Sequence, residues 1–163
     1  PQEKDFKVTV RAAERSDIAA MAEVYQACFP REKNHAQWIE ASFNAYPRGV
    51  YYVVEVAGVV RGYILWCVKN GFREKSIIEL EQIGIHPDAA GQGLGKRLIV
   101  ESLAPFKAHV RGLGCGVGAV MVTTSEGNFA EKLYQSTLGV SRAAVVSGYG
   151  AGDEVILYNP SMA

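Results

Sequence analysis

Three glycines within five residues constrain the possible folds of this chain more than any other feature of its sequence. The segment Gly91-Gln92-Gly93-Leu94-Gly95-Lys96 follows a β-rich run that ends at Ile85, and a helical pattern continues from it. The start of a helix carries unpaired backbone amides and about half a positive charge. Glycines let such a backbone approach an anion without interference from side chains. The pattern therefore predicts a strand–loop–helix unit that binds a phosphate group.

The spacing of the glycines separates the possible phosphate ligands. A dinucleotide-binding loop has its third glycine at the sixth position, where this chain has Lys96. A Walker loop has Ser or Thr after its Gly-Lys pair, where this chain has Arg97. Both nucleotide motifs are therefore excluded, and a tight turn without a ligand is the alternative that the loop alone leaves open.

Hydrophobic periodicity predicts one α/β domain over residues 1–163. We expect the element order β-α-α-β-β-β-α-β-α-β-β. The expected strands span 7–11, 50–56, 59–68, 76–85, 117–123, 140–147 and 154–158. The expected helices span 17–29, 36–46, a segment that runs on from the glycine loop, and 129–138. Ser16 is expected to be the N-cap of the first helix, and Pro105 to kink or break the third.

Composition narrows the classes of partner. The chain has 17 Lys and Arg against 17 Asp and Glu, so it has no general attraction for nucleic acid or anionic lipid. No apolar run approaches the roughly 20 residues that cross a bilayer. Three scattered cysteines fit neither a disulfide framework nor a metal site. We therefore expect a cytoplasmic protein with reduced thiols, and no nucleic-acid, membrane or metal partner.

Three segments, at residues 10–18, 83–95 and 130–139, together resemble the GNAT superfamily, the Gcn5-related N-acetyltransferases. Val10–Ala13 with Ser16–Ile18 is similar to the family's opening strand and first helix. Residues 83–95 resemble its acetyl-coenzyme A segment, and Ala130 with Leu133-Tyr134 and Leu138-Gly139 resembles its second cofactor segment. The resemblance implies a GNAT-like α/β (α+β) fold. This fold has a mixed, mostly antiparallel central sheet of about seven strands, with helices on both faces.

The resemblance also implies a binding site for acetyl-coenzyme A (acetyl-CoA). Backbone amides would hold its pyrophosphate, and backbone groups of the preceding strand would pair with its pantetheine arm, in a slot where the fourth and fifth strands splay. The implied cofactor residues are Ile83, Gly84, Ile85, Gly91, Gln92, Gly93, Leu94, Gly95, Lys96 and Asn128. Two departures weaken this implication. Ala90 stands where the family has Arg or Gln, and Asn128 lies six rather than seven residues before Tyr134.

Acetyl transfer to an amine needs a base for the amine and an acid for the departing thiolate. Glu79 and Glu81 lie two residues apart on one expected strand, so they share a face and either could accept the proton through water. The resemblance favours Glu79, and solvated strand glutamates are the alternative. Tyr134 is the candidate acid, with an ordinary core tyrosine as the alternative.

The expected activity is transfer of an acetyl group from acetyl-CoA to a primary amine, by direct attack in a ternary complex. The acceptor would be a small molecule or a peptide or protein N-terminus, bound near 29–46 or near Tyr149. We expect a monomer or homodimer. A non-catalytic acetyl-CoA sensor or interaction module is the alternative, because of Ala90 and the displaced Asn128.

Overall fold

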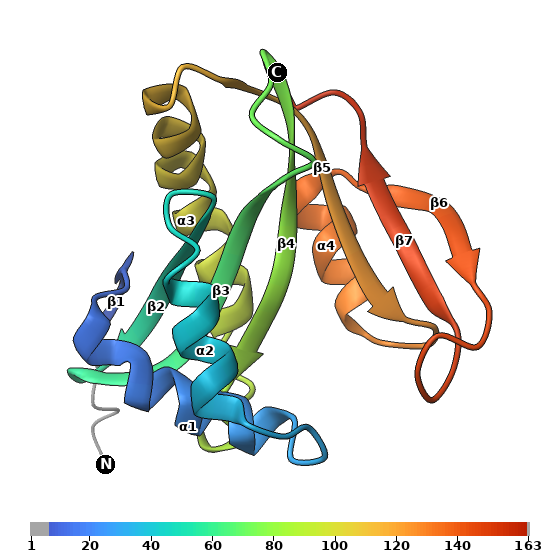
Figure 1. The fold of residues 1–163 in the computed structure, drawn as a ribbon. Coiled ribbons are helices and arrows are strands. Elements are labelled where there is room, and N and C mark those ends of the chain that lie inside the picture. Colours follow the sequence, from blue (N-terminus) through green and yellow to red (C-terminus); the bar gives the residue numbers. More distant parts are fainter. Residues whose placement is uncertain (1–6, 163) are drawn as a thin grey trace. The chain divides into compact units, whose positions relative to one another are not determined.

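The computed structural model describes residues 7–162. Seven strands form a mixed, mostly antiparallel sheet in the order β1-β2-β3-β4-β5-β7-β6 (Figure 1). The strands are β1 (Val8–Ala12), β2 (Gly49–Val56), β3 (Val59–Lys69), β4 (Lys75–Ile85), β5 (Gly116–Ser125), β6 (Ser141–Val146) and β7 (Glu154–Asn159). The helices are α1 (Ile18–Cys28), α2 (His35–Phe43), α3 (Leu94–Gly112) and α4 (Ala130–Leu138), with short 3-10 turns η1 (Arg15–Asp17) and η2 (Pro87–Ala89). The predicted element order and fold class are confirmed.

The chain divides into two compact units. The first unit takes in residues up to Leu65 together with Gln82–Ser102, and the second takes in Trp66–Glu81 together with the chain from Leu103 on. No helix in the described part of the chain combines the length and apolar character that a membrane crossing requires.

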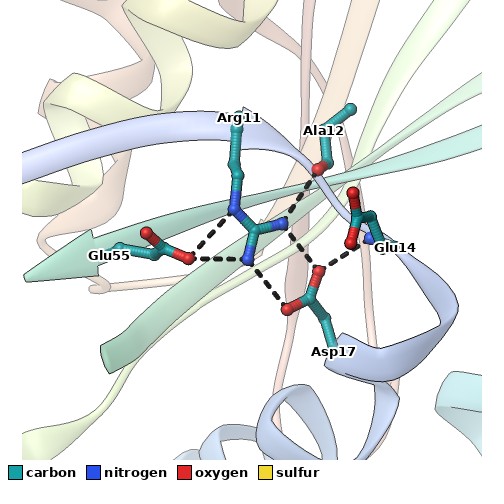
Figure 2. A network of polar contacts seen from close by, with 5 residues as sticks. All are labelled: Arg11, Ala12, Glu14, Asp17 and Glu55. Atoms are coloured by element: carbon teal, nitrogen blue, oxygen red, sulfur yellow. Dashed lines mark hydrogen bonds and ion pairs between the residues drawn. The ribbon is translucent and has the colours of Figure 1, made fainter. Parts of the chain in front are cut away.

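An arginine at the edge of the sheet holds the start of the first unit together (Figure 2). The guanidinium of Arg11 on β1 donates to both oxygens of Asp17, at 2.7 and 2.9 Å, and to Glu55 on β2 at 2.7 and 3.0 Å. The hydrogen bonds from Arg11 hold the pKa of the Asp17 carboxyl below its usual value. Asp17 also accepts from the amide of Glu14 at 2.7 Å. This network fixes the chain where β1 passes into α1.

The first helix begins differently from the sequence expectation. Ser16 lies inside η1, and Asp17 rather than Ser16 occupies the N-cap position of α1. The expectation was wrong because the Asp17 carboxylate, held by Arg11, closes the turn through the Glu14 amide. Figure 1 shows α1 and α2 side by side, and the aromatic ring of Tyr25 packs between Phe29, His35 and Trp38.

The third helix continues through Pro105. The predicted break does not occur, although proline removes one helical hydrogen bond. In the second unit Phe106 is fully buried and stacks on Trp66, with ring centroids 5.9 Å apart. Val110, one turn further on, is also fully buried. Burial of these side chains stabilises the helix beyond the proline, at about 1.5–3 kcal/mol for each large apolar group.

The parallel pairing of β4 with β5 lies within the second unit. It runs from Lys75 opposite Gly116 to Leu80 opposite Val122, with an irregularity after Ser76. Pairing with β5 ends there, although β4 continues to Ile85. The last residues of β4 therefore keep backbone groups that β5 does not use.

Candidate functional site

The glycine loop of the first unit has the geometry of an open turn. Gly91 and Gly93 adopt left-handed backbone angles, with φ of 78° and 72°. A Cβ atom placed on either glycine would meet no atom within 4 Å. These glycines are therefore required by the backbone conformation and not by crowding from neighbouring atoms. The α-helix begins at Leu94, directly after them.

The amides of this loop are unpaired in the part of the chain that the structure describes. Within residues 7–162, no acceptor is found for the amide hydrogens of Gly91 to Lys96, and the next amide, that of Arg97, donates to Gly93 at 3.2 Å. Unpaired amides at the start of a helix form a binding site for an anion such as a phosphate group. The loop therefore fits a diphosphate, which has acceptor oxygens on both phosphorus atoms.

The end of β4 lies against α1 within the same unit. Gly84 is buried, and a Cβ there would lie 3.2 Å from Tyr63 Cε1 and 3.4 Å from Cys28 Sγ. The Cys28 thiol donates to the carbonyl of Ile85 at 3.1 Å. Burial raises the pKa of this thiol, so it stays protonated and inert as a nucleophile. The absence of a side chain at Gly84 thus allows β3, β4 and α1 to meet closely.

A polar cluster at the end of β4 was missed by sequence reasoning. Tyr25 donates to Glu32 at 2.6 Å, and Tyr63 donates to Gln82 at 2.6 Å. Burial, together with the nearby Glu32 carboxylate, raises the pKa of Tyr25 to about 12. Glu32 is exposed, and among residues 7–162 the hydroxyl of Tyr25 is the hydrogen-bond partner of its carboxylate. In the sequence, Tyr25 fits the helical spacing of an apolar stripe. The cluster could not be predicted from this local pattern, because it depends on contacts between α1, β3 and β4.

The two predicted base residues lie in the second unit with different partners. Glu79 forms an ion pair with Lys69, in which Lys69 Nζ lies 3.1 Å from Glu79 Oε2. Glu81 is exposed and accepts from the buried thiol of Cys67 at 2.8 Å. Both contacts join β3 to β4, so these two carboxylates are anchored on the strand pair.

Tyr134, the predicted acid, is a buried residue of α4 in the second unit, with 6% of its surface exposed. Burial raises the pKa of its hydroxyl to about 12. The phenol therefore holds its proton throughout the working range of most enzymes. Protonation of a thiolate with a pKa near 8.5 would then be uphill by about 5 kcal/mol.

Asn128 has a structural role at the start of α4. Its Oδ1 accepts from the amide of Ala130 at 2.9 Å, which closes the turn before the helix. The side-chain amide nitrogen has no acceptor among residues 7–162.

The structure places the predicted site residues in two groups. Ile83–Ile85 and the loop Gly91–Lys96 belong to the first unit, whereas Glu79, Glu81, Asn128 and Tyr134 belong to the second.

Comparison with known proteins agrees with the resemblance seen in the sequence. The model of the acetyltransferase (GNAT) family matches residues 18–140. A search of curated protein sequences found no match.

Solved structures share the fold at low sequence identity. The ribosomal-protein-S18-alanine N-acetyltransferase from Escherichia coli is 22% identical with a TM-score of 0.77, and 96% of each chain is covered. The yncA protein from Salmonella typhimurium, solved with its cofactor acetyl-CoA, is 23% identical with a TM-score of 0.66, covering 94% of this chain and 93% of that one. An acetyltransferase from Bacillus subtilis in complex with CoA is 15% identical with a TM-score of 0.68, covering 96% and 100%. The predicted cofactor agrees with the family and with the ligands of these two neighbours.

Proposed function

The chain belongs to the acetyltransferase (GNAT) family, and from that membership we propose that it is an acetyl-CoA-dependent N-acetyltransferase of the cytoplasm. In this proposal residues 1–163 act as one catalytic domain, as a monomer or homodimer. The acceptor is a primary amine of a small molecule or of a peptide or protein N-terminus. The amine attacks directly in a ternary complex.

The unpaired amides of Gly91 to Lys96 carry this proposal. Among residues 7–162 they have no acceptor, they lie at the start of a long helix, and the residues Gly91, Gln92 and Gly93 before it are exposed. Acetyl-CoA brings a diphosphate and an acetyl thioester. The loop amides would bind the diphosphate, and the backbone of Ile83, Gly84 and Ile85, beyond the end of the β5 pairing, would bind the pantetheine arm.

The remaining residues of this chain would move protons. Glu79 or Glu81 would hold the proton released by the attacking amine, directly or through water. Tyr134 would donate its phenolic proton to the leaving sulfur. Its raised pKa keeps the phenol protonated before this transfer. The phenolate left afterwards would regain a proton from solvent before the next turnover.

The acceptor amine would approach the cluster formed by Tyr25 and Glu32. Glu32 is an exposed carboxylate without an ion-pair partner among residues 7–162, and an amine is cationic near neutral pH. A pocket of about 240 Å³, lined by residues 28–32, adjoins this carboxylate. In the same unit Cys28 contacts Ile85, so the pocket lies beside the end of β4.

Release of free thiol from acetyl-CoA tests the activity. The assay would use a panel of peptides, polyamines and amino acids, with mass spectrometry of the product. At least one amine is expected to be acetylated, and Glu32→Gln should raise the KM for cationic acceptors while the KM for acetyl-CoA stays unchanged. Absence of turnover with every amine class would contradict the enzymatic proposal.

A second function is favoured by two observations. The Asn128 side chain is engaged with the amide of Ala130 at the start of α4, and Ala90 offers no polar side chain beside the loop. A non-catalytic acetyl-CoA sensor would bind the coenzyme without using it. Calorimetric binding of acetyl-CoA together with no acetylated product would favour the sensor, and turnover would exclude it.

A further inference from the structure

A cavity of about 440 Å³ lies in the second unit at the start of β4. Its walls come from the loop before β4 and the beginning of β4, from β5, and from β7 with the chain after it. The lining residues are Arg73, Lys75, Ile77, Gly118, Ala119, Tyr158, Pro160 and Ser161. Its volume falls within the range of about 300–1,000 Å³ that is usual for small-molecule sites.

Two cations on this wall have no ion-pair partner in the described part of the chain. Neither the Arg73 guanidinium nor the Lys75 ammonium makes an ion pair or a side-chain hydrogen bond within residues 7–162. Elsewhere in this unit the cations of Lys69 and Arg142 are paired with glutamates. A pair of unneutralised cations beside one concave surface attracts an anion.

The opposite wall is held firmly in place. The amide of Met162 donates to Gly118 at 2.9 Å, and Lys107 donates to the carbonyl of Met162 at 3.3 Å. Asn159 donates to the carbonyl of Leu138 at 2.9 Å and accepts from the amide of Ser161 at 3.0 Å. These contacts fix the segment that presents Ser161, so the cavity is a built feature of the unit.

Gly118 keeps the cavity open at its base. A Cβ on Gly118 would lie 3.0 Å from the Cβ of Lys75, so a side chain there would push Lys75 away from β5. The hydroxyl groups of Tyr158 and Ser161 can donate hydrogen bonds to a ligand. Neither hydroxyl forms a hydrogen bond within residues 7–162. Ile77, Ala119 and Pro160 supply an apolar surface.

We propose that this cavity binds a small organic anion, namely an apolar body that carries one phosphate or carboxylate group. Arg73 would take the anion with paired N–H donors, and Lys75 would add a point charge. The apolar body would lie on Ile77 and Ala119. The charged end of the site lies at the start of β4, and the predicted bases lie further along the same strand. Glu79 is four residues beyond Lys75, or about 13 Å, and Glu81 is six residues beyond it, or about 20 Å. The proposal is independent of the acetyltransferase activity.

Titrations followed by backbone amide NMR test this site in the intact chain of 17.7 kDa. The probes are phenyl phosphate and benzoate, with benzyl alcohol as the uncharged control. Saturable shifts are expected at residues 73–77, 118–119 and 158–161 with at least one anion and not with the alcohol. The two anions decide between a phosphate and a carboxylate ligand. Shifts confined to residues 91–96, or no saturable shift with either anion, would overturn the proposal.

Two variants separate the charge from the cavity. Arg73→Gln with Lys75→Gln should weaken binding at least tenfold, whereas Arg111→Gln with Lys132→Gln removes the same charge from exposed positions outside the cavity. This control should bind within twofold of the parent chain. Ser161→Trp should fill the cavity and abolish binding with both cations retained. Equal affinity in the first variant and the parent, or unchanged affinity in Ser161→Trp, would overturn the assignment.

Discussion

The ammonium of Lys69 lies 3.1 Å from the carboxylate of Glu79, and the two side chains are 32% and 16% exposed. The residue that resemblance favours as the base is therefore part of an ion pair between β3 and β4. A fully solvated ion pair contributes about 0–1 kcal/mol to stability, and this pair is partly buried. The contact positions the Glu79 carboxylate on the strand pair.

Glu79→Gln should lower kcat with little change in stability. If Glu79 accepts the amine proton, the loss should be about 100-fold or more and greatest at low pH, where fewer amines are neutral. Lys69→Gln is the matched control, since it breaks the same ion pair and keeps the carboxylate. Steady-state rates from pH 6 to 9 measure both variants. If the two variants lose activity equally, Glu79 acts through its ion pair, and Glu81→Gln becomes the test of the remaining carboxylate.

Tyr134→Phe should separate chemistry from binding. It removes the proton donor and keeps the buried ring, so we expect kcat to fall about 100-fold or more while the Kd for acetyl-CoA changes less than twofold. Because its pKa is about 12, Tyr134 should add no alkaline loss of activity between pH 7 and 10. Calorimetry measures the binding and thiol release measures the rate. Full activity in Tyr134→Phe would leave the tyrosine as a core residue.

Alkaline pH should destabilise the fold through its buried tyrosines. Burial raises the pKa of Tyr52 and Tyr134 to about 12, as it does for Tyr25, from an unfolded value near 10. A raised folded-state pKa gives stability that is complete below pH 10 and is lost as the pH rises toward 12. The melting temperature should therefore fall in that window. Tyr52→Phe should flatten the decline, and an unchanged slope would contradict the burial of this hydroxyl.

The elements could be predicted from the sequence because each carries a local signal. Val and Tyr runs mark β2 and β3, and Pro87 with the following glycines marks the passage from β4 to α3. The prediction of a break at Pro105 was wrong. It considered the hydrogen bond that proline removes and did not include the stacking of Phe106 on Trp66. That contact joins residues 40 positions apart in sequence, which no window around Pro105 contains.

The site could be predicted only where backbone makes it. The amides of Gly91 to Lys96 follow from glycine spacing alone, and the structure leaves them without acceptors among residues 7–162. The partners of the side chains could not be predicted from the sequence. Nothing local indicates that Glu32 meets Tyr25, or that Lys69 meets Glu79, because both pairings depend on how distant elements align.

Gly93→Ala should weaken acetyl-CoA binding through the backbone. Its φ of 72° is left-handed, and an L-residue there costs about 1–2 kcal/mol. The loop amides should then turn away from the anion, with at least a tenfold rise in Kd. Gly114→Ala is the matched control, since Gly114 has a φ of 82° and equally open surroundings. It should cost similar stability and leave the Kd unchanged, and equal losses of affinity would remove the loop from the coenzyme site.

Two substitutions at Asn128 should separate its capping role from a role in coenzyme binding. Asn128→Asp keeps the oxygen that accepts from Ala130 and removes the amide donor, whereas Asn128→Ala removes both. The alanine variant should lose about 1 kcal/mol of unfolding free energy, and the aspartate variant should lose little. If the Nδ2 donor contacts acetyl-CoA, both variants should bind it more weakly, and the added negative charge should make aspartate the weaker. Denaturant unfolding and calorimetry measure the two properties independently, and normal affinity in both variants would reduce Asn128 to a cap of α4.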